Sequence, residues 1–414
     1  MQNMIELKEA EEKVILAAVS LSEEGADASL DELEELARTA GASVCGRVVQ
    51  KRESVHPGTY LGKGKLQELK FLIFETEATG LICDDELTPA QMGNLERELD
   101  IKVMDRTLLI LDIFAERAVS SEGKIQVELA QLRYRAAHLT GMGKVLSRLG
   151  GGIGTRGPGE KKLEVDRRRI RERISQLKKQ LEEVKQHREL VHVQRKNSAM
   201  KTAALVGYSN VGKSTCLNYL TDAGILADDM LFATLDTTTR MLELSHSQKI
   251  LLTDTVGFIQ KLPHHLVEAF KSTLEEVLYA DIIVHVVDAS NPQRDTQMCV
   301  VYDTLRELGV KDKPVITLFN KQDKLDAPEV PRDLRADYSL GISAKTGQGM
   351  EEFRQALAEI LQKDQIYIER LIPYAKAGVI QLIREYGQLL EEAYQEDGIA
   401  IKACVPERIY FQIL

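Results

Sequence analysis

A glycine-rich segment that ends in a lysine and a serine is the clearest sign of chemistry in this sequence. It has the spacing GxxxxGK[ST] and contains Gly207, Tyr208, Ser209, Asn210, Val211, Gly212, Lys213 and Ser214. The apolar run 202–206 precedes it and a helix-like stretch follows it, as this pattern requires. Its backbone N–H groups can face phosphates, Lys213 can neutralise phosphate charge, including that of a transition state, and Ser214 can bind Mg²⁺. The segment therefore predicts a site for a nucleoside triphosphate.

Three later segments indicate that this nucleotide is GTP or GDP. They are Asp254, Thr255, Val256 and Gly257, then Asn320, Lys321, Gln322 and Asp323, and finally Ser343, Ala344 and Lys345. A carboxylate at Asp254 can hold the Mg²⁺ shell through water, and the N–H of Gly257 can meet the γ-phosphate. Asp323 can accept hydrogen bonds from guanine N1–H and N2–H₂, a donor pair that adenine lacks. A backbone N–H of residues 343–345 can meet guanine O6.

These motifs need a scaffold of parallel strands, which the sequence also predicts. The apolar runs 202–206, 249–254, 281–288 and 314–319 are separated by helical stretches, as is typical of a parallel sheet covered on both faces. A second alternation has strand-like runs at 14–20, 42–49, 79–84 and 101–105, and helical stretches at 30–40, 63–76 and 88–99. It predicts a smaller, mainly parallel α/β domain. Near the C-terminus we expect one helix, at about 374–394, and a final strand.

The chain has 414 residues, too many for one ordinary domain, and we divide it into four parts. They are an N-terminal α/β domain (1–124), a helical hairpin linker (125–199) with a glycine-rich loop (147–160), a P-loop domain (200–364) and a small C-terminal α/β domain (365–414). The hairpin is expected because 161–197 lacks Gly and Pro and has one apolar stripe, and a helical stretch precedes the loop. The stripe can be buried within the hairpin, so we expect a monomer. The fold class is α/β.

A basic segment lies within an acidic protein. The net charge of the chain is −10, but residues 141–201 carry 17 Lys or Arg and 7 Asp or Glu, a local balance of +10. We expect the segment to contact the phosphates of an RNA through arginines in and after the glycine-rich loop, namely Arg148, Arg156, Arg167, Arg168 and Arg169. Aromatic residues do not interleave with them, so a folded RNA suits the segment better than a single strand. A solvated charged helix without a ligand is the alternative interpretation.

The sequence disfavours several other classes of protein and site. No apolar run is long enough to span a bilayer, and the N-terminus lacks the features of a signal peptide, so we expect a cytoplasmic protein without membrane insertion. The five cysteines are scattered, which argues against disulfides and a Cys-rich zinc site. His264 and His265 are adjacent, but we interpret them as part of a solvated loop rather than as a metal site.

The motifs GYSNVGKS, DTVG, NKQD and SAK, in this order, resemble those of P-loop GTPases of the translation-factor class. The segment FATLD resembles switch I of the Obg–HflX group, and the similarity to the HflX family extends to 59–69, 128–174 and the C-terminal tail. The resemblance implies a nucleotide-binding segment of Phe232, Ala233, Thr234, Leu235 and Asp236. It also implies that the Thr234 hydroxyl joins the Mg²⁺ shell, with Thr237, Thr238 and Thr239 as rivals.

The resemblance further implies slow GTP hydrolysis that the large ribosomal subunit, including its rRNA, stimulates. It implies binding in the GTP state, splitting or rescue of stalled or idle ribosomes under stress, release on hydrolysis, and no role for DNA. Asn210 suggests that K⁺ stimulates hydrolysis. Gln260 is a candidate for orienting the attacking water, because Phe258, directly after Gly257, is apolar. Two alternatives stay open, a signalling GTPase with a protein partner and an ATP- or GTP-dependent RNA remodelling enzyme.

Overall fold

The computed structural model describes residues 12–20, 23–146, 158–197, 200–221, 230–232, 236–244, 248–261, 274–328, 330–363, 365–406 and 410–411. The chain divides into two compact units. The first unit comprises Met1–Glu183, Met230–Phe232 and Gln260–Phe270, and the second unit comprises Val184–Asp229, Ala233–Ile259 and Lys271–Leu414. Two short pieces from the middle of the chain thus belong to the unit that the N-terminal residues form.

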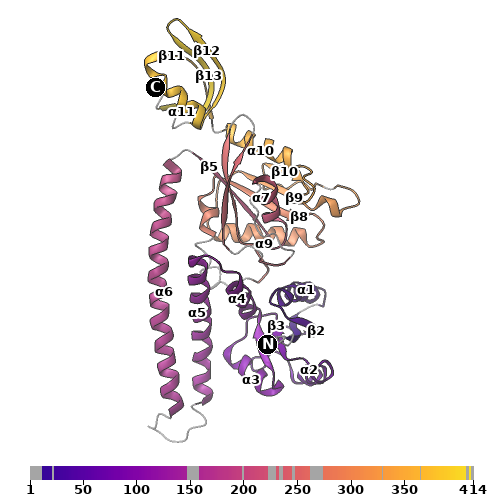
Figure 1. Ribbon diagram of the computed structural model, residues 1–414. Helices are drawn as coiled ribbons and strands as arrows, with labels where there is room; N and C mark the ends of the chain where they lie inside the picture. Colours follow the sequence, from indigo (N-terminus) through magenta and orange to yellow (C-terminus); the bar gives the residue numbers. More distant parts are fainter. Residues whose placement is uncertain are drawn as a thin grey trace, which may run out of the picture. The chain divides into compact units, whose positions relative to one another are not determined.

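The first unit contains a four-stranded parallel sheet with the strand order β2-β1-β3-β4 (Figure 1). Its strands are β1 (Lys13–Ser20), β2 (Ser43–Lys51), β3 (Gly80–Cys83) and β4 (Lys102–Asp105). The helices between and after them are α1 (Glu23–Thr39), α2 (Lys63–Thr76), α3 (Pro89–Leu99) and α4 (Arg106–Arg117). The expected parallel strands are confirmed, whereas α4 is not predicted, because its apolar residues follow β4 without a turn.

Both faces of this sheet are buried, which explains the near-continuous apolar runs in the sequence. Ile15 and Ala17 of β1 lie in one apolar cluster with Leu69 of α2 and Leu95 of α3. Residues that alternate with them point to the opposite face, where α1 packs on β1.

Local sequence signals set where the helices of the first unit begin. Thr88 and Gln91 form a reciprocal capping box at the start of α3, with Pro89 in the first turn. Asp105 accepts a hydrogen bond from the N–H of Leu108 at 2.8 Å. This carboxylate both ends β4 and caps α4, so the strand passes directly into the helix.

Two long helices, α5 (Ser121–Leu146) and α6 (Pro158–Asn197), follow the sheet and form the expected hairpin. They run antiparallel and lie side by side in Figure 1. Arg173 of α6 donates to both carboxylate oxygens of Glu128 in α5 at 2.7 and 2.9 Å. Six residues earlier in α6, Arg167 donates to the carbonyl oxygen of Leu139 at 2.6 Å, further along α5.

The expected apolar stripe of α6 is its least exposed part. Leu177 is fully buried, and Ile170, Ile174 and Leu181 are partly buried, whereas most of their described neighbours are exposed. The loop predicted at 147–160 ends earlier than expected, because Pro158 already lies in α6. Proline suits the first turn of a helix, since the N–H that it lacks would have no partner there.

The second unit contains a six-stranded sheet with the order β10-β9-β8-β5-β7-β6. The strands are β5 (Lys201–Gly207), β6 (Thr238–Glu243), β7 (Lys249–Asp254), β8 (Ile282–Asp288), β9 (Val315–Asn320) and β10 (Tyr338–Gly341). Helical segments of this part are α7 (Lys213–Thr221), α9 (Arg294–Glu307), η2 (Gln322–Lys324) and α10 (Met350–Lys363). All strand pairs are parallel except β6 with β7. The four predicted strands are confirmed, and β6 and β10 are additional.

The C-terminal residues correct one expectation. They form an antiparallel sheet of order β11-β13-β12, with β11 (Gln365–Ile372), β12 (Gln388–Gln395) and β13 (Gly398–Pro406). Its helical segments are η3 (Tyr374–Lys376) and α11 (Gly378–Tyr386). The helix expected at 374–394 is therefore wrong in its second half. Gly387 ends α11, and a Cβ there would lie 2.7 Å from the carbonyl oxygen of Cys404 in β13, so the chain turns into a strand instead.

Candidate nucleotide-binding site

The glycine-rich segment lies between the end of β5 and the start of α7, as the motif requires. Its first and last glycines cannot be replaced without a clash. A Cβ on Gly207 would lie 2.3 Å from the carbonyl oxygen of Val286, and one on Gly212, where φ is +95°, would lie 2.4 Å from Nδ2 of Asn320. Close backbone approach, rather than flexibility alone, is thus the reason for glycine at both ends.

Lys213, the lysine of this segment, is buried and interacts with backbone oxygens of its own loop. Its Nζ donates to the carbonyl of Tyr208 at 2.8 Å and to that of Gly207 at 3.3 Å. Burial lowers the pKa of Lys213 to about 8, although the nearby Asp254 carboxylate opposes this. An anionic phosphate would replace neutral carbonyls as the partner of the ammonium, which favours its charged form.

Two oxygen-bearing side chains meet beside the segment. Ser214 Oγ donates to Asp254 Oδ2 at 2.6 Å, which joins the start of α7 to the end of β7. Thr255, the next residue, donates to the carbonyl of Leu205 in β5 at 2.6 Å. The end of β7 is therefore fixed against β5, and a hydroxyl and a carboxylate lie together where a hard cation could use them.

The residues after β7 pair with the glycine-rich segment. Phe258 accepts a hydrogen bond from the N–H of Ser209 at 2.7 Å and donates its own N–H to Gly207 at 3.1 Å. Gly257 is so close to this segment that a Cβ would lie 2.7 Å from Cα of Ser209 and 3.1 Å from Nζ of Lys213. Gly257, Phe258 and Lys213 thus form one close-packed group.

Asn320 and Lys321, which we expect to bind the nucleotide, connect the end of β9 to the glycine-rich segment and to residues 343–345. The Asn320 amide donates to the carbonyl of Val211 at 2.8 Å and accepts from the N–H of Ala344 at 2.9 Å. Lys321 Nζ donates to the carbonyl of Asn210 and binds Asp288, both at 2.8 Å. These two side chains hold the glycine-rich segment and the 343–345 segment in register.

Asp288 is a residue of this site that the sequence analysis misses. It is the last residue of β8. Its carboxylate forms an ion pair with Lys321 and accepts hydrogen bonds from the N–H and the hydroxyl of Ser290. The available signal is its position, since a carboxylate at the end of a central parallel strand lies at the same edge as the other motifs.

Asp323, the expected base-selecting carboxylate, is oriented by a serine of another expected motif. Ser343 Oγ donates to Asp323 Oδ1 at 2.6 Å. This hydrogen bond is the main reason that the pKa of Asp323 lies below its usual value. The carboxylate is thus ionised at neutral pH and can accept the hydrogen bonds that guanine would donate.

Only part of the predicted switch I segment is described. Residues 233–235, and with them Ala233, Thr234 and Leu235, lie outside the described residues, whereas Phe232 and Asp236 are included. Phe232 belongs to the first unit and packs edge-to-face on Phe114, with 4.6 Å between ring centroids. Of the rival threonines, Thr238 and Thr239 lie in β6, and Thr239 Oγ1 is 2.9 Å from Oγ1 of Thr253.

The remaining candidates lie in the first unit or outside the described residues. Gln260 accepts a hydrogen bond at its carbonyl oxygen from Arg106 at 3.0 Å, and its role in orienting water stays a prediction. Arg148 and Arg156 are not among the described residues. Arg167 is partly buried, whereas Arg168 and Arg169 are exposed, and Arg168 binds Glu172 at 2.8 Å.

Two further expectations concern metals and membranes. Among the described residues there is no group of three or more His, Cys, Asp or Glu side chains that could hold a metal ion; His264 and His265 lie outside this part of the chain. Within the same described part, no helix combines the length and apolar character needed to cross a membrane.

Comparison with known proteins gives matches along most of the chain. Three family models match, described as GTP-binding GTPase N-terminal (27–115), GTP-binding GTPase Middle Region (117–195) and 50S ribosome-binding GTPase (202–321). A GTPase HflX from Lacrimispora saccharolytica is 64% identical over 411 residues, which cover 99% of this chain and 97% of that protein. The GTPase HflX of Escherichia coli is 38% identical over 407 residues, with 97% and 96% coverage. A GTP-binding protein from Sulfolobus solfataricus, solved in complex with GDP, is 26% identical with a TM-score of 0.45, over 85% of this chain and 99% of that one.

Proposed function

This chain belongs to the HflX family of GTPases, and we propose that its GTP-bound form binds the large ribosomal subunit to split or rescue stalled or idle ribosomes. The chain binds GTP and GDP and hydrolyses GTP to GDP and phosphate. The observation that carries the proposal is a basic helical hairpin in the same chain as a GTPase domain of the kind described as 50S ribosome-binding.

The hairpin offers charge that can meet rRNA. Arg168 and Arg169 are exposed in the first third of α6. Arginine suits phosphate contacts, because its planar guanidinium presents several donors at once. At 40 residues, α6 is about 60 Å long. We propose that these arginines, with Arg148 and Arg156 of the loop and Arg167, contact the rRNA of the large subunit.

The nucleotide site supports a Mg²⁺-dependent reaction. We propose that Ser214 and Thr234 bind Mg²⁺ and that Asp254 holds its shell, since hydroxyl and carboxylate oxygens are the ligands that this ion prefers. The ion, when bound, neutralises charge on the β- and γ-phosphates. Lys213 contributes positive charge at the same phosphates, the N–H of Gly257 meets the γ-phosphate, and Asp323 selects guanine. We keep Gln260 as the candidate that orients the attacking water.

Release would follow from the loss of the γ-phosphate. Contacts to this group order switch I and the residues after Asp254, and hydrolysis removes them. A nucleotide can control ribosome binding only if the two nucleotide states differ in affinity for the subunit. The proposal therefore requires that the GTP form binds the large subunit more tightly than the GDP form.

The test is GTP hydrolysis with and without purified large ribosomal subunits, with ATP as the control nucleotide. We expect a large stimulation by the subunit with GTP and none with ATP. Slow GTP turnover that the subunit leaves unchanged would contradict the proposal and favour the alternative of a signalling GTPase with a protein partner. Subunit-stimulated turnover of ATP would favour the RNA remodelling alternative.

The same assay tests a role for K⁺. We propose that Asn210, which lies in the glycine-rich segment with φ of +61°, helps to hold K⁺ near the phosphates. Hydrolysis should then be faster in K⁺ than in Na⁺ at equal ionic strength. Equal rates in the two salts would exclude this role for K⁺.

A further inference from the structure

The first unit contains a cluster of buried charges at the carboxyl ends of two neighbouring parallel strands. Asp84 and Asp85 follow β3, and Arg106 begins α4 directly after β4. Asp84 is 1% exposed and so is Arg106, which makes this the most deeply buried ion pair of the described part of the unit. We call Asp84, Asp85 and Arg106 the docking cluster.

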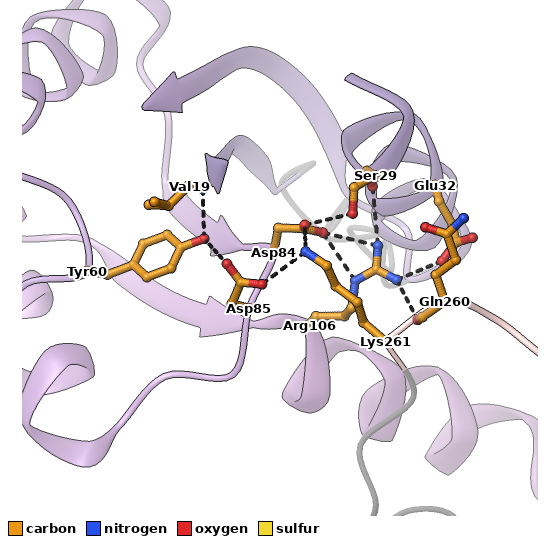
Figure 2. Close-up of polar contacts among 9 residues, drawn as sticks. All are labelled: Val19, Ser29, Glu32, Tyr60, Asp84, Asp85, Arg106, Gln260 and Lys261. Atoms are coloured by element: carbon orange, nitrogen blue, oxygen red, sulfur yellow. Dashed lines mark hydrogen bonds and ion pairs between the residues drawn. The ribbon is translucent and has the colours of Figure 1, made fainter. Parts of the chain in front are cut away.

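The docking cluster binds Gln260 and Lys261, which follow Gly257 by three and four residues (Figure 2). Arg106 Nη1 donates to the carbonyl oxygen of Gln260 at 3.0 Å. Lys261 Nζ forms ion pairs with Asp84 and with Asp85, the latter at 2.9 Å. The cluster therefore binds one backbone group and one side chain of this short segment.

Further contacts within the first unit fix the docking cluster in place. Arg106 also binds Glu32 at 2.6 Å and donates to the carbonyl oxygen of Ser29 at 3.2 Å. Asp85 accepts a hydrogen bond from the hydroxyl of Tyr60 at 2.6 Å, and that hydroxyl in turn accepts one from the N–H of Val19 at 3.1 Å. A site whose side chains are already held by neighbours loses little entropy when it binds its ligand.

The ion pair of Lys261 with Asp84 differs from an ordinary surface ion pair, because the carboxylate of Asp84 is buried. Burial alone would raise the pKa of Asp84, but Arg106 and Lys261 together hold that pKa below its usual value. Removal of Lys261 would leave the buried carboxylate of Asp84 with less positive charge, which costs more than the loss of an exposed pair. Lys261 also has φ of +51°, a backbone conformation that residues other than glycine rarely adopt. The segment is thus held in one specific conformation.

Residues just before this segment are fixed to the phosphate-binding loop in the second unit. Phe258 exchanges hydrogen bonds with Gly207 and Ser209, and Gly257 lies against Ser209 and Nζ of Lys213. Lys213 itself donates to Tyr208 and Gly207. For phosphates to occupy this loop, Lys213 must exchange its carbonyl partners for phosphate oxygens, and Gly257, whose N–H would meet the γ-phosphate, lies beside this lysine.

A movement of Gly257 or Phe258 would reach Gln260 along a very short stretch of chain. Two peptide units separate Phe258 from Gln260, and an extended chain spans only about 3.3–3.6 Å per residue. A γ-phosphate that drew Gly257 and Phe258 toward it would therefore pull on Gln260 and Lys261, the two residues that the docking cluster binds. GDP lacks the γ-phosphate and imposes no such shift.

We propose that the docking cluster binds the Gln260–Lys261 segment in competition with the γ-phosphate, so that Lys261 sets how strongly the protein distinguishes GTP from GDP. Lys261 is then a positioning residue, and the first unit is coupled to the nucleotide through it. This inference rests on the proposed contact of Gly257 with the γ-phosphate, but not on ribosome binding.

The test measures dissociation constants of the full-length chain for GDP and for a non-hydrolysable GTP analogue, without ribosomal subunits. The variants are Lys261→Met, Asp85→Asn and the double variant, because both positions are partly exposed and the changes keep side-chain size. Lys70→Met is the matched control, since Lys70 forms an ion pair with Glu98 at 3.0 Å in the same unit and away from the docking cluster.

We expect Lys261→Met and Asp85→Asn each to raise the affinity for the GTP analogue relative to GDP by about fivefold or more, within the usual range of coupling between sites. The double variant should equal Lys261→Met, because that change alone removes both ion pairs of Lys261, whereas Asp85→Asn removes one of them. Lys70→Met should leave the ratio of the two affinities unchanged. An unchanged ratio in both docking-cluster variants, or a ratio that shifts toward GDP, would overturn the inference. Neither result would alter subunit-stimulated hydrolysis, so a failure here is distinct from a failure of the proposed function.

Discussion

At the scale of single residues, Asp323 is the side chain that we propose selects the base. Its carboxylate is ionised and oriented by Ser343, at 2.6 Å. We predict that Asp323→Asn weakens GDP binding by at least about 10- to 100-fold, because a hydrogen bond to a charged group contributes roughly 1.5–3 kcal/mol. Fluorescent GDP titration measures this, with Asp326→Asn, a nearby exposed carboxylate, as the control. Activity that survives Asp323→Asn would argue for ATP as the substrate.

Lys213 gives a second prediction at this scale, concerning pH. Its pKa is about 8 because it is buried, and phosphate binding favours its charged form. Below pH 8 the ammonium is already present, so GDP affinity should change little. Above pH 8 binding must take up a proton, and the dissociation constant should rise by up to about tenfold per pH unit.

Calorimetry can check the pH prediction directly. Titrations of GDP at a pH above 8, in two buffers with different ionisation enthalpies, report the number of protons taken up. Lys213→Arg keeps the positive charge over this range and should abolish the uptake. Equal proton uptake in the wild type and in this variant would assign the proton to another group.

The residues of the site were predictable in so far as motif spacing reveals them. Gly207, Lys213, Asp254 and Asp323 could be recognised from short patterns, because each pattern follows a strand. Asp288 could not be recognised in this way. It binds Lys321 because β8 and β9 are neighbours in the sheet, and the residues that flank Asp288 in the sequence do not indicate this. The direct partners of Lys261 lie 176 and 177 residues away in sequence, and no local pattern encodes such a pairing.

At the scale of elements, the described arginines in the first half of α6 fall into two groups, those that hydrogen-bond to α5 and those that are exposed without doing so. Arg167 and Arg173 contribute to the pairing of α5 with α6, whereas Arg168 and Arg169 are exposed. A test of RNA binding should therefore change only the second pair, because loss of the first would also weaken the hairpin.

We predict that Arg168→Ala with Arg169→Ala weakens binding to the large subunit and lowers the slope of log affinity against log salt concentration. The slope should fall by roughly one unit per phosphate contact that is lost. Lys178→Ala with Lys179→Ala removes equal charge from exposed positions on the same helix and serves as the control. Pelleting with subunits across a salt series measures both. Identical slopes in the two double variants would show that helix charge in general, and not this arginine pair, contacts the RNA.

Elements were predictable where one periodicity extends over the whole segment. The parallel strands are apolar throughout because both faces of each sheet are covered. The C-terminal residues differ, because 388–395 (QLLEEAYQ) has charges and leucines at spacings that also fit a helix. Gly387 at the start and the two-residue turn Glu396-Asp397 at the end favour the strand, because the backbone of β12 then pairs with that of β13.

At the scale of the whole molecule, the chain's two compact units do not follow simple sequence boundaries. The four-part division by sequence could not foresee that Met230–Phe232 and Gln260–Phe270 belong with the N-terminal residues. The ring of Phe232 packs on that of Phe114, and Lys261 forms an ion pair with Asp84. Phe232 lies in the predicted switch I segment and Lys261 follows Gly257 by four residues, so stretches at or near the predicted nucleotide-binding residues also hold the first unit together.

This discontinuity has a consequence for the order of events during protein synthesis. Arg106 donates a hydrogen bond to the carbonyl of Gln260, and the ribosome adds Gln260 to the chain 154 residues after Arg106. At roughly 5–20 residues per second, the ribosome needs about 8–30 s to reach it. The N-terminal unit therefore emerges from the ribosome before the Arg106 side chain has all its hydrogen-bond partners, and it can complete these contacts only after the first part of the GTPase sequence has been translated.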